Sequence, residues 1–422
     1  MQNINIQNSC GKFNFIVNLV FFMLVFALSI SLLVNSIPQK VFYLASYLCI
    51  FVLIFKAKEL LRGKLFQKNF VLLISSFFIF GLVRIFWAEF ISIKYEVLSD
   101  MALSILNDYA LSGKRFILGV FIITVMACYS NEISEKCIKL SKIVLFFGAV
   151  TTLFFGIKEY ELTHTRIFLT ANAPSSTAYM VIFMYCSYLW LPIKKANKKW
   201  LLVDMLLMIS IFCLVILSGT RIAFLAYFFI TLYQINRHYG LMYILKPMRN
   251  RLIALVVISV IAFLSGNRWV EAFNNIKEYD KNSSTSVGAR VAIWDSGLHF
   301  FPEHLGFTSP DVRTKSAREY IALYHKGNAE AYKNVQSNMH NEFLDVSTLQ
   351  GIAGLASLLF IYYSVLMIWI SRNVLMGIAM PATALFIMGM TDTVLFFPAT
   401  AMLFIISTAL CVVRSKSDVS LP

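Results

Sequence analysis

Residues 346–369 read VSTLQGIAGLASLLFIYYSVLMIW, a run of 24 residues without one charged side chain. A helix of about 20 apolar residues spans the hydrocarbon core of a bilayer, so this run predicts a membrane-spanning helix. The segment before it, 267–345, is polar and carries charges along its length. Most of the remaining chain repeats the apolar pattern. We therefore expect the functional site to include residues of the polar segment 267–345.

The composition of the chain is that of a membrane protein. Of its 422 residues, 59% are hydrophobic and 14% are charged, whereas about a quarter of a soluble globular domain is charged. We predict an all-α polytopic membrane protein, a single transmembrane domain over 1–422 with one large outer loop, 267–345. Its twelve predicted spans are 14–34, 41–55, 70–88, 115–130, 142–157, 173–193, 201–218, 222–236, 252–266, 346–369, 375–390 and 394–412.

Lysine and arginine predict the orientation, because cytoplasmic loops are enriched in them. The termini and one set of loops hold 20 of the 37 basic residues and four of the 22 acidic ones. We therefore predict that both termini are cytoplasmic and that 267–345 lies outside. The net charge of +15 then reflects topology and does not indicate nucleic-acid binding. The outer segment has 9 basic against 10 acidic residues, so an anion bound there requires particular arginines.

Short helices are predicted inside the outer segment. The first is capped by Ser286 and stops before Pro302, and a second covers about 311–334 with an interruption at Gly327. Helical spacing of apolar residues supports the first helix. Its apolar face consists of Val291, Trp294, Leu298 and Phe301.

Three arginines near the outer face are candidates for binding an anion. Arg221 ends the stretch 218–221 between two apolar runs, with almost no room for a loop. An arginine beside a span usually faces a cavity or a partner, and guanidinium matches phosphate by bidentate hydrogen bonds; a snorkelling interface arginine is the alternative. Arg166, in the outer segment 158–172, could equally be a loop cation, and Arg290 could anchor its helix to lipid headgroups.

His340 stands at the boundary of a predicted span among polar neighbours. A neutral imidazole can take a proton from a hydroxyl nucleophile or donate to an oxyanion; a capping or surface histidine is the alternative. Asp392, in the short outer turn 391–393, could orient the histidine, pair with an arginine or serve only the turn. Glu342 is a possible supporting residue, although residues i and i+2 do not face each other on a helix.

No motif for a metal or a nucleotide is visible. The sequence lacks Asp-x-Asp, Gly-x-x-x-x-Gly-Lys, His-Glu-x-x-His and Gly-x-Ser-x-Gly. Its seven cysteines lie outside the outer segment at irregular spacing, which predicts neither a disulfide framework nor a zinc site. We expect no cofactor and no metal, with outer arginines neutralising a departing pyrophosphate.

The order and spacing of these motifs resemble a known family. They are similar to the O-antigen ligases of Gram-negative bacteria and to their relatives, the O-antigen polymerases, over nearly the whole chain. The residues that carry the resemblance are Thr220-Arg221 between two spans, Val287-Gly288-Ala289-Arg290 with Trp294 in the large outer loop, and His340-Asn341-Glu342 followed by Gly351-Ile352-Ala353-Gly354 in the next span.

The resemblance implies a type-C glycosyltransferase fold in the bacterial inner membrane, with its active site on the periplasmic face. The donor would be a polysaccharide on undecaprenyl pyrophosphate, and the acceptor a sugar hydroxyl of the lipid A–core oligosaccharide. Neither metal nor ATP is implied. Arg221 and Arg290 match family arginines that hold the donor pyrophosphate, and Arg166 has a looser match. His340 matches the family histidine, here a candidate general base, and Asp392 also has a counterpart.

Three other functions stay open at this point. A polymerase uses the same donor with a second lipid-linked chain as acceptor. A lipid-linked oligosaccharide transporter would place charges deep in its spans and open a path to both sides, whereas the candidate residues here gather at the outer face. A non-catalytic scaffold of envelope assembly is opposed only by the family spacing of Arg221, Arg290 and His340.

Overall fold

The computed structural model describes residues 2–62, 68–191, 198–239, 246, 270, 285–371 and 375–413. Their regular structure is helical. Eleven of the twelve predicted spans coincide with helices, and the span at 252–266 lies outside the described residues. The helices are α1 (Gln2–Ile30), α2 (Ile37–Arg62), α3 (Lys68–Lys94), α4 (Asp100–Cys128), α5 (Glu135–Thr163), α6 (Pro174–Trp190), α7 (Lys198–Ser218), α8 (Arg221–Tyr239), α14 (Glu342–Ile370), α15 (Ala379–Gly389, after the 3-10 turn Met376–Ile378) and α16 (Pro398–Cys411).

Within the described ranges, five helices are long and apolar enough to cross a membrane, namely α3, α4, α5, α14 and the part of α2 from Ile37 to Lys56. The boundary predicted for the fourth span is wrong, because α4 begins at Asp100 and not near residue 115. Ser99 caps this helix by accepting a hydrogen bond from the backbone N–H of Ala102 at 3.2 Å. Its first turns are polar, so apolar run length alone places the start too late.

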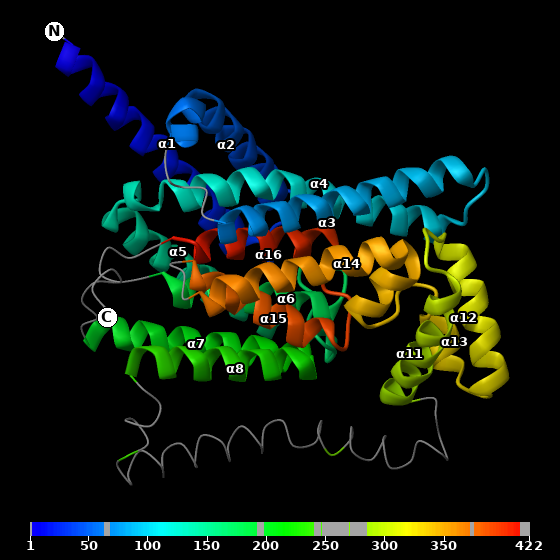
Figure 1. Ribbon diagram of the computed structural model, residues 1–422. Helices are drawn as coiled ribbons and strands as arrows, with labels where there is room; N and C mark the ends of the chain where they lie inside the picture. Colours follow the sequence, from blue (N-terminus) through cyan, green and yellow to red (C-terminus); the bar gives the residue numbers. More distant parts are fainter. Residues whose placement is uncertain are drawn as a thin grey trace.

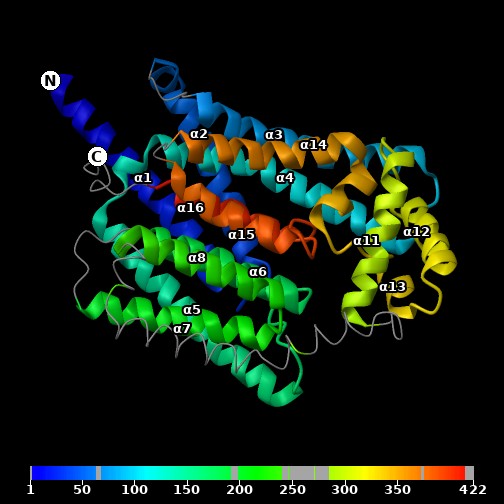
Figure 2. The same ribbon diagram turned by 60° about the horizontal axis from the view of Figure 1, so that its bottom comes forward.

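The helices named above run roughly side by side, and three short helices lie across one end of them (Figures 1 and 2). α1 begins and α16 ends at the opposite end of the molecule. Helix α3 packs closely on α4 and α14. A Cβ atom on Gly81 would lie 2.7 Å from the carbonyl oxygen of Gly113, so glycine permits this approach of α3 to α4, as small residues do between membrane helices.

The three transverse helices are α11 (Ser286–Glu303), α12 (Pro310–Tyr324) and α13 (Ala329–Asn334). They confirm the two helices predicted within 267–345 and the interruption at Gly327, where φ is +85°. The predicted cap is one residue out: Thr285, not Ser286, accepts from the N–H of Gly288 at 3.1 Å. The predicted end of this helix is also wrong, because α11 continues through Pro302 to Glu303.

A break in α14 joins the transverse helices to the spanning ones. Gly351 has φ 60° and ψ −151° inside α14, a conformation that only glycine adopts readily. The chain between α11 and α12 enters this break: Ile352 N–H donates to the Leu305 carbonyl at 3.0 Å, and Thr308 N–H donates to the Leu349 carbonyl at 2.9 Å. The Trp87 indole of α3 donates to the Thr308 carbonyl at 3.0 Å. These bonds fix the transverse helices against the bundle.

Candidate functional site

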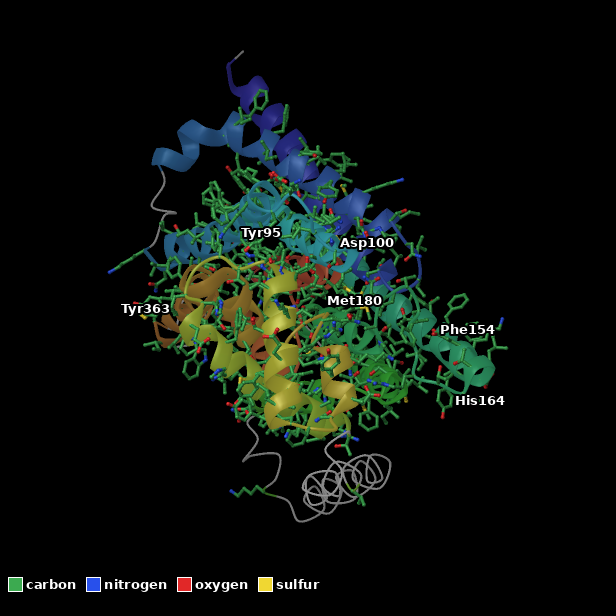
Figure 3. All side chains as sticks on the ribbon, turned by 90° about the vertical axis from the view of Figure 1, so that its right-hand side faces the viewer. Tyr95, Asp100, Phe154, His164, Met180 and Tyr363 are labelled. Atoms are coloured by element: carbon green, nitrogen blue, oxygen red, sulfur yellow. The ribbon has the colours of Figure 1, made fainter. Side chains whose placement is uncertain are left out.

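A cavity of about 870 Å³ lies where α11 faces the ends of α4, α6 and α8. Its size is that of a small-molecule or cofactor site. Five of the six predicted site residues line it, although they are spread from residue 166 to residue 392. Figure 3 faces this end of the molecule, with α11–α13 in front and Tyr95 and Asp100, at the α3–α4 connection, above them in the view. The five residues are Arg166, Arg221, Arg290, His340 and Asp392.

His340 sits just before α14 in a left-handed backbone conformation, with φ 47°. Its own N–H donates to the Asn338 side chain at 2.9 Å, and its carbonyl accepts from the Trp294 indole at 3.0 Å. The ring atom Nδ1 lies 3.3 Å from Oδ1 of Asp392. Among the described residues, Nε2 has no hydrogen-bond partner. With Nδ1–H directed at the carboxylate, Nε2 carries the lone pair and can act as a base.

Asp392 is held from three sides in the turn between α15 and α16. The Tyr179 hydroxyl donates to Oδ2 at 2.8 Å, and the backbone N–H of Thr393 donates to Oδ1 at 3.0 Å. Burial raises the pKa of this carboxyl, but the hydrogen bond from His340 and the positive charges of His340 and Arg290 outweigh it, so the pKa of Asp392 lies below its ordinary value. An ionised carboxylate therefore faces the imidazole.

Arg221 is the first residue of α8, after a two-residue turn that follows α7. Gly219 forms this turn with φ +63°, which confirms that the connection is almost without a loop. Arg166 packs on the turn, donating from Nε to the Ser218 carbonyl at 2.8 Å and from Nη2 to the Thr220 hydroxyl at 3.4 Å. Two guanidinium groups thus lie together at a helix N-terminus, where the helix dipole also favours an anion.

Arg290 stands near the N-terminus of α11 and lines the same cavity. Its charge acts on Asp392, which places the third guanidinium near the histidine–carboxylate pair. The structure thus brings together arginines from the 164–172 loop, from α8 and from α11 around one space. Such an arrangement can bind a group with several negative charges.

Glu342 does not line this cavity. Its side chain is 1% exposed and pairs with Arg84 of α3, with 3.2 Å between Oε1 and Nη2. Oε2 accepts from the Leu395 N–H at 2.8 Å. Asn341 is the N-cap of α14, so Glu342 is the first residue of the helix and His340 lies before it. The side chain of Glu342 points into the protein interior. Glu342 therefore cannot contact a ligand in the cavity from this position.

Of the further polar residues that line the cavity, two that the sequence did not single out bear on its chemistry. Tyr179 of α6 reaches Asp392, and Asp108 of α4 contributes a second carboxylate. Ser104 and Asp108 are four residues apart on α4, so they lie on one face of the helix. A polar pair at this spacing was the available signal for Asp108. The sequence analysis missed it because the predicted span began at residue 115, so Asp108 was not assigned to a helix. Nothing in the sequence around Tyr179 distinguishes it from other apolar-span tyrosines.

A second cavity of about 860 Å³ adjoins the first and shares Arg166 and Arg221 with it. The remaining walls are mostly apolar and come from the ends of α5, α7 and α8. The arginines thus stand between a polar cavity and an apolar one. Within the described ranges, no three His, Cys, Asp or Glu side chains form a group that could hold a metal ion. The apolar lining includes Phe168, Val215, Ile216, Leu217 and Phe224.

Comparison with known proteins gives two matches. A family model described as O-antigen ligase matches residues 205–359. The chain is also 23% identical over 407 residues to the O-antigen ligase of Escherichia coli (strain K12), and the alignment covers 93% of this chain and 92% of that protein. The family match includes Arg221, Arg290 and His340, while Arg166 precedes it and Asp392 follows it.

Proposed function

The chain belongs to the O-antigen ligase superfamily, and from this premise we propose that it is a glycosyltransferase of lipopolysaccharide biosynthesis. It transfers polysaccharide from undecaprenyl pyrophosphate to a sugar hydroxyl of lipid A–core. The observation that carries the proposal is the cavity that combines three arginines with the His340–Asp392 pair. One end of this space suits a pyrophosphate, and the other suits a hydroxyl that must lose a proton.

The arginines bind the donor and stabilise its departure. A lipid-linked pyrophosphate is a good leaving group whose negative charge grows as the glycosidic bond breaks. Arg166, Arg221 and Arg290 line the cavity from different elements, so they can hold the two phosphates in one orientation by bidentate hydrogen bonds. Fixed positive charges in a partly enclosed site stabilise such a transition state. In this proposal they take the place of a divalent cation.

His340 activates the acceptor. Nε2 takes the proton of the sugar hydroxyl while its oxygen attacks the anomeric carbon, and the pyrophosphate leaves from the opposite face with inversion of configuration. Asp392, 3.3 Å from Nδ1, holds the ring and stabilises the imidazolium that forms. The carboxylate stays ionised because its pKa lies below the ordinary value.

The second cavity suits the isoprenoid part of the donor. Its walls are mostly apolar, and Arg166 and Arg221 lie at its boundary with the first cavity, so a lipid in it would present its pyrophosphate to the arginines. The charge distribution of the loops supports a periplasmic position for the site, in the inner membrane with both termini cytoplasmic. Helix α11, which lines the cavity, lies at the end of the bundle opposite the start of α1 (Figure 1).

The test is a gel of lipopolysaccharide with parallel extraction of lipid-linked polymer, from cells in which the gene is deleted and then restored. Deletion should leave unsubstituted core and full-length polymer on its lipid carrier. Wild type and His299→Ala should restore ligation, because His299 is an exposed histidine of α11 outside the cavity lining. His340→Ala should not. Core capped by single repeat units would indicate a polymerase and overturn the assignment.

Cofactor need is tested with purified protein, lipid-linked donor and lipid A–core. Transfer should proceed in excess chelator without ATP, because the cationic side chains supply the positive charge. Strict dependence on a divalent cation or on ATP would contradict this part of the proposal.

A further inference from the structure

Two buried ion pairs lie behind the cavity, on the first turn of α14. Glu342 and Asp345 are three residues apart and each is about 1% exposed. Each faces a fully buried arginine, Arg84 of α3 and Arg313 of α12. A buried ion pair contributes little net stability, because desolvation offsets the attraction between the charges. Two such pairs on one helical turn therefore point to a role other than stability.

The Asp345–Arg313 pair holds the chain that leads into His340. Oδ1 of Asp345 accepts from Arg313 Nη1 at 2.7 Å and from the Met339 N–H at 2.9 Å, and Oδ2 accepts from the Tyr109 hydroxyl. Arg313 Nη2 donates to the Ser337 carbonyl at 3.3 Å. Residues 337 and 339 are thus fixed immediately before His340, whose left-handed backbone is uncommon for a residue with a side chain.

The Glu342–Arg84 pair holds the chain that follows Asp392. Oε2 of Glu342 accepts from the Leu395 N–H at 2.8 Å. Arg84 Nη1 donates to the Leu395 carbonyl at 2.6 Å and to the Ser112 hydroxyl at 2.8 Å. Both backbone groups of residue 395 are therefore tied to one ion pair, three residues after the carboxylate that faces His340.

We propose that Asp345–Arg313 and Glu342–Arg84 are positioning pairs that set the distance between His340 and Asp392. Both acids lie on one turn of α14. This turn therefore fixes the backbone before His340 relative to the backbone after Asp392. The catalytic consequence rests on the proposed function, since it assumes that His340 acts on a hydroxyl. Arg313 also makes the site depend on the docking of α12, because the arginine comes from a transverse helix and reaches a carboxylate of a spanning one.

The first test is hydrogen exchange on purified protein in detergent, which needs no activity. Asp345→Asn should speed exchange at residues 337–340, and Glu342→Gln should speed it at residues 393–396, in each case at least about tenfold, with the rest of the protein unchanged. The matched control is Asp204→Asn, because Asp204 also accepts from a basic residue and a tyrosine, Lys142 at 3.2 Å and Tyr188 at 2.6 Å, but lies outside the cavity lining.

The second test is kinetic. Loss of a hydrogen-bond partner behind a metal ligand typically costs 10–100-fold in activity, and we expect Asp345→Asn and Glu342→Gln to lower kcat to a similar extent. Donor KM should stay within about threefold, because the arginines that bind the donor are untouched. Asp204→Asn should keep the kcat of the wild type. If Asp345→Asn does not fold, Tyr109→Phe removes one hydrogen bond from the same carboxylate and should slow transfer to a smaller extent.

The outcomes separate the two proposals. Unchanged exchange at both segments, exchange that rises uniformly over the protein, or an unchanged kcat in folded Asp345→Asn and Glu342→Gln would overturn the positioning role. If the wild type transfers no polymer but the exchange pattern is as described, the positioning pairs stand and the proposed function fails.

Discussion

Asp392→Asn tests the histidine–carboxylate pair with the smallest change in shape. The amide can still contact Tyr179 and Thr393, but it removes the charge that faces His340 at 3.3 Å. The side chains of His340 and Asp392 are only 24% and 12% exposed, so solvent does not fully replace the lost interaction. A hydrogen bond to a charged group contributes about 1.5–3 kcal/mol. Since about 1.4 kcal/mol is a factor of ten in rate, kcat should fall about 10- to 150-fold.

The assay is single-turnover transfer from a lipid-linked donor to lipid A–core by purified protein. The control is Asp295→Asn, because Asp295 also faces a histidine, with 2.8 Å between Oδ2 and Nε2 of His325, on the transverse helices away from the cavity lining. Asp392→Asn should slow transfer with little change in donor KM, whereas Asp295→Asn should not slow it.

Two results would refute the reasoning. Transfer by Asp392→Asn at the wild-type rate would show that the carboxylate does not assist the histidine. A loss equal to that of His340→Ala together with a large rise in donor KM would show instead that the substitution disrupts the donor site.

Four other substitutions or conditions test separate features of the structure. Arg290→Lys should raise donor KM about tenfold, because an ammonium cannot form the planar bidentate contact of a guanidinium; an unchanged donor KM in kinetic assays would count against donor binding. Asp108→Asn should raise acceptor KM about tenfold and leave donor KM unchanged in the same assays, because the Asp108 carboxylate lines the cavity and can accept hydrogen bonds from sugar hydroxyls, whereas it offers no hydrogen-bond donor to a pyrophosphate. Gly351→Ala should destabilise the protein by roughly 1–3 kcal/mol from the backbone alone, plus the clash of a Cβ atom 2.1 Å from the Leu305 carbonyl oxygen; thermal unfolding in detergent measures this loss, and wild-type stability would contradict it. Folding lowers the pKa of Asp392, so its ionised form adds stability that is present above the ordinary carboxyl pKa of about 4 and is lost as the pH falls through the lowered value. The difference in Tm between wild type and Asp392→Asn should therefore stay constant from pH 7 to about 5 and shrink only below about 4. A difference that vanishes near pH 6 would argue against a lowered pKa.

The helices could be predicted from the sequence because an apolar run in a membrane has few structural solutions. Backbone polar groups must bond within the segment there, and a helix satisfies them all. This reasoning located eleven described helices, whereas the two helices predicted within 267–345, with the interruption at Gly327, came from local sequence patterns. It failed at the start of α4, where Ser99 and Asp100 begin a helix that is polar over its first turns. Hydropathy reports burial in lipid, and a capped polar end gives no such signal.

The candidate residues were found by chemistry, since arginine, histidine and aspartate at the ends of apolar runs are costly there without a purpose. Their roles stay predictions, but five of them line one cavity. Glu342 was chosen for its nearness to His340 in sequence, and this reasoning missed Asp345, which is farther along the chain but supports the histidine segment directly.

The sequence by itself determined the helical class and the types of group available for binding an anion and moving a proton, and its charge pattern predicts the sides of the membrane. Only the tertiary structure decided which of these groups meet. A guanidinium at residue 166 and a carboxylate at residue 392 share a cavity because α6 packs on both α8 and α16 and α11 lies across the end of the bundle. The backbone at His340 is left-handed. The His340 ring lies at the cavity, whereas the Glu342 side chain lies in the interior. Periodicity records which residues share a face of one helix, and it holds no information on which faces of separate helices come into contact.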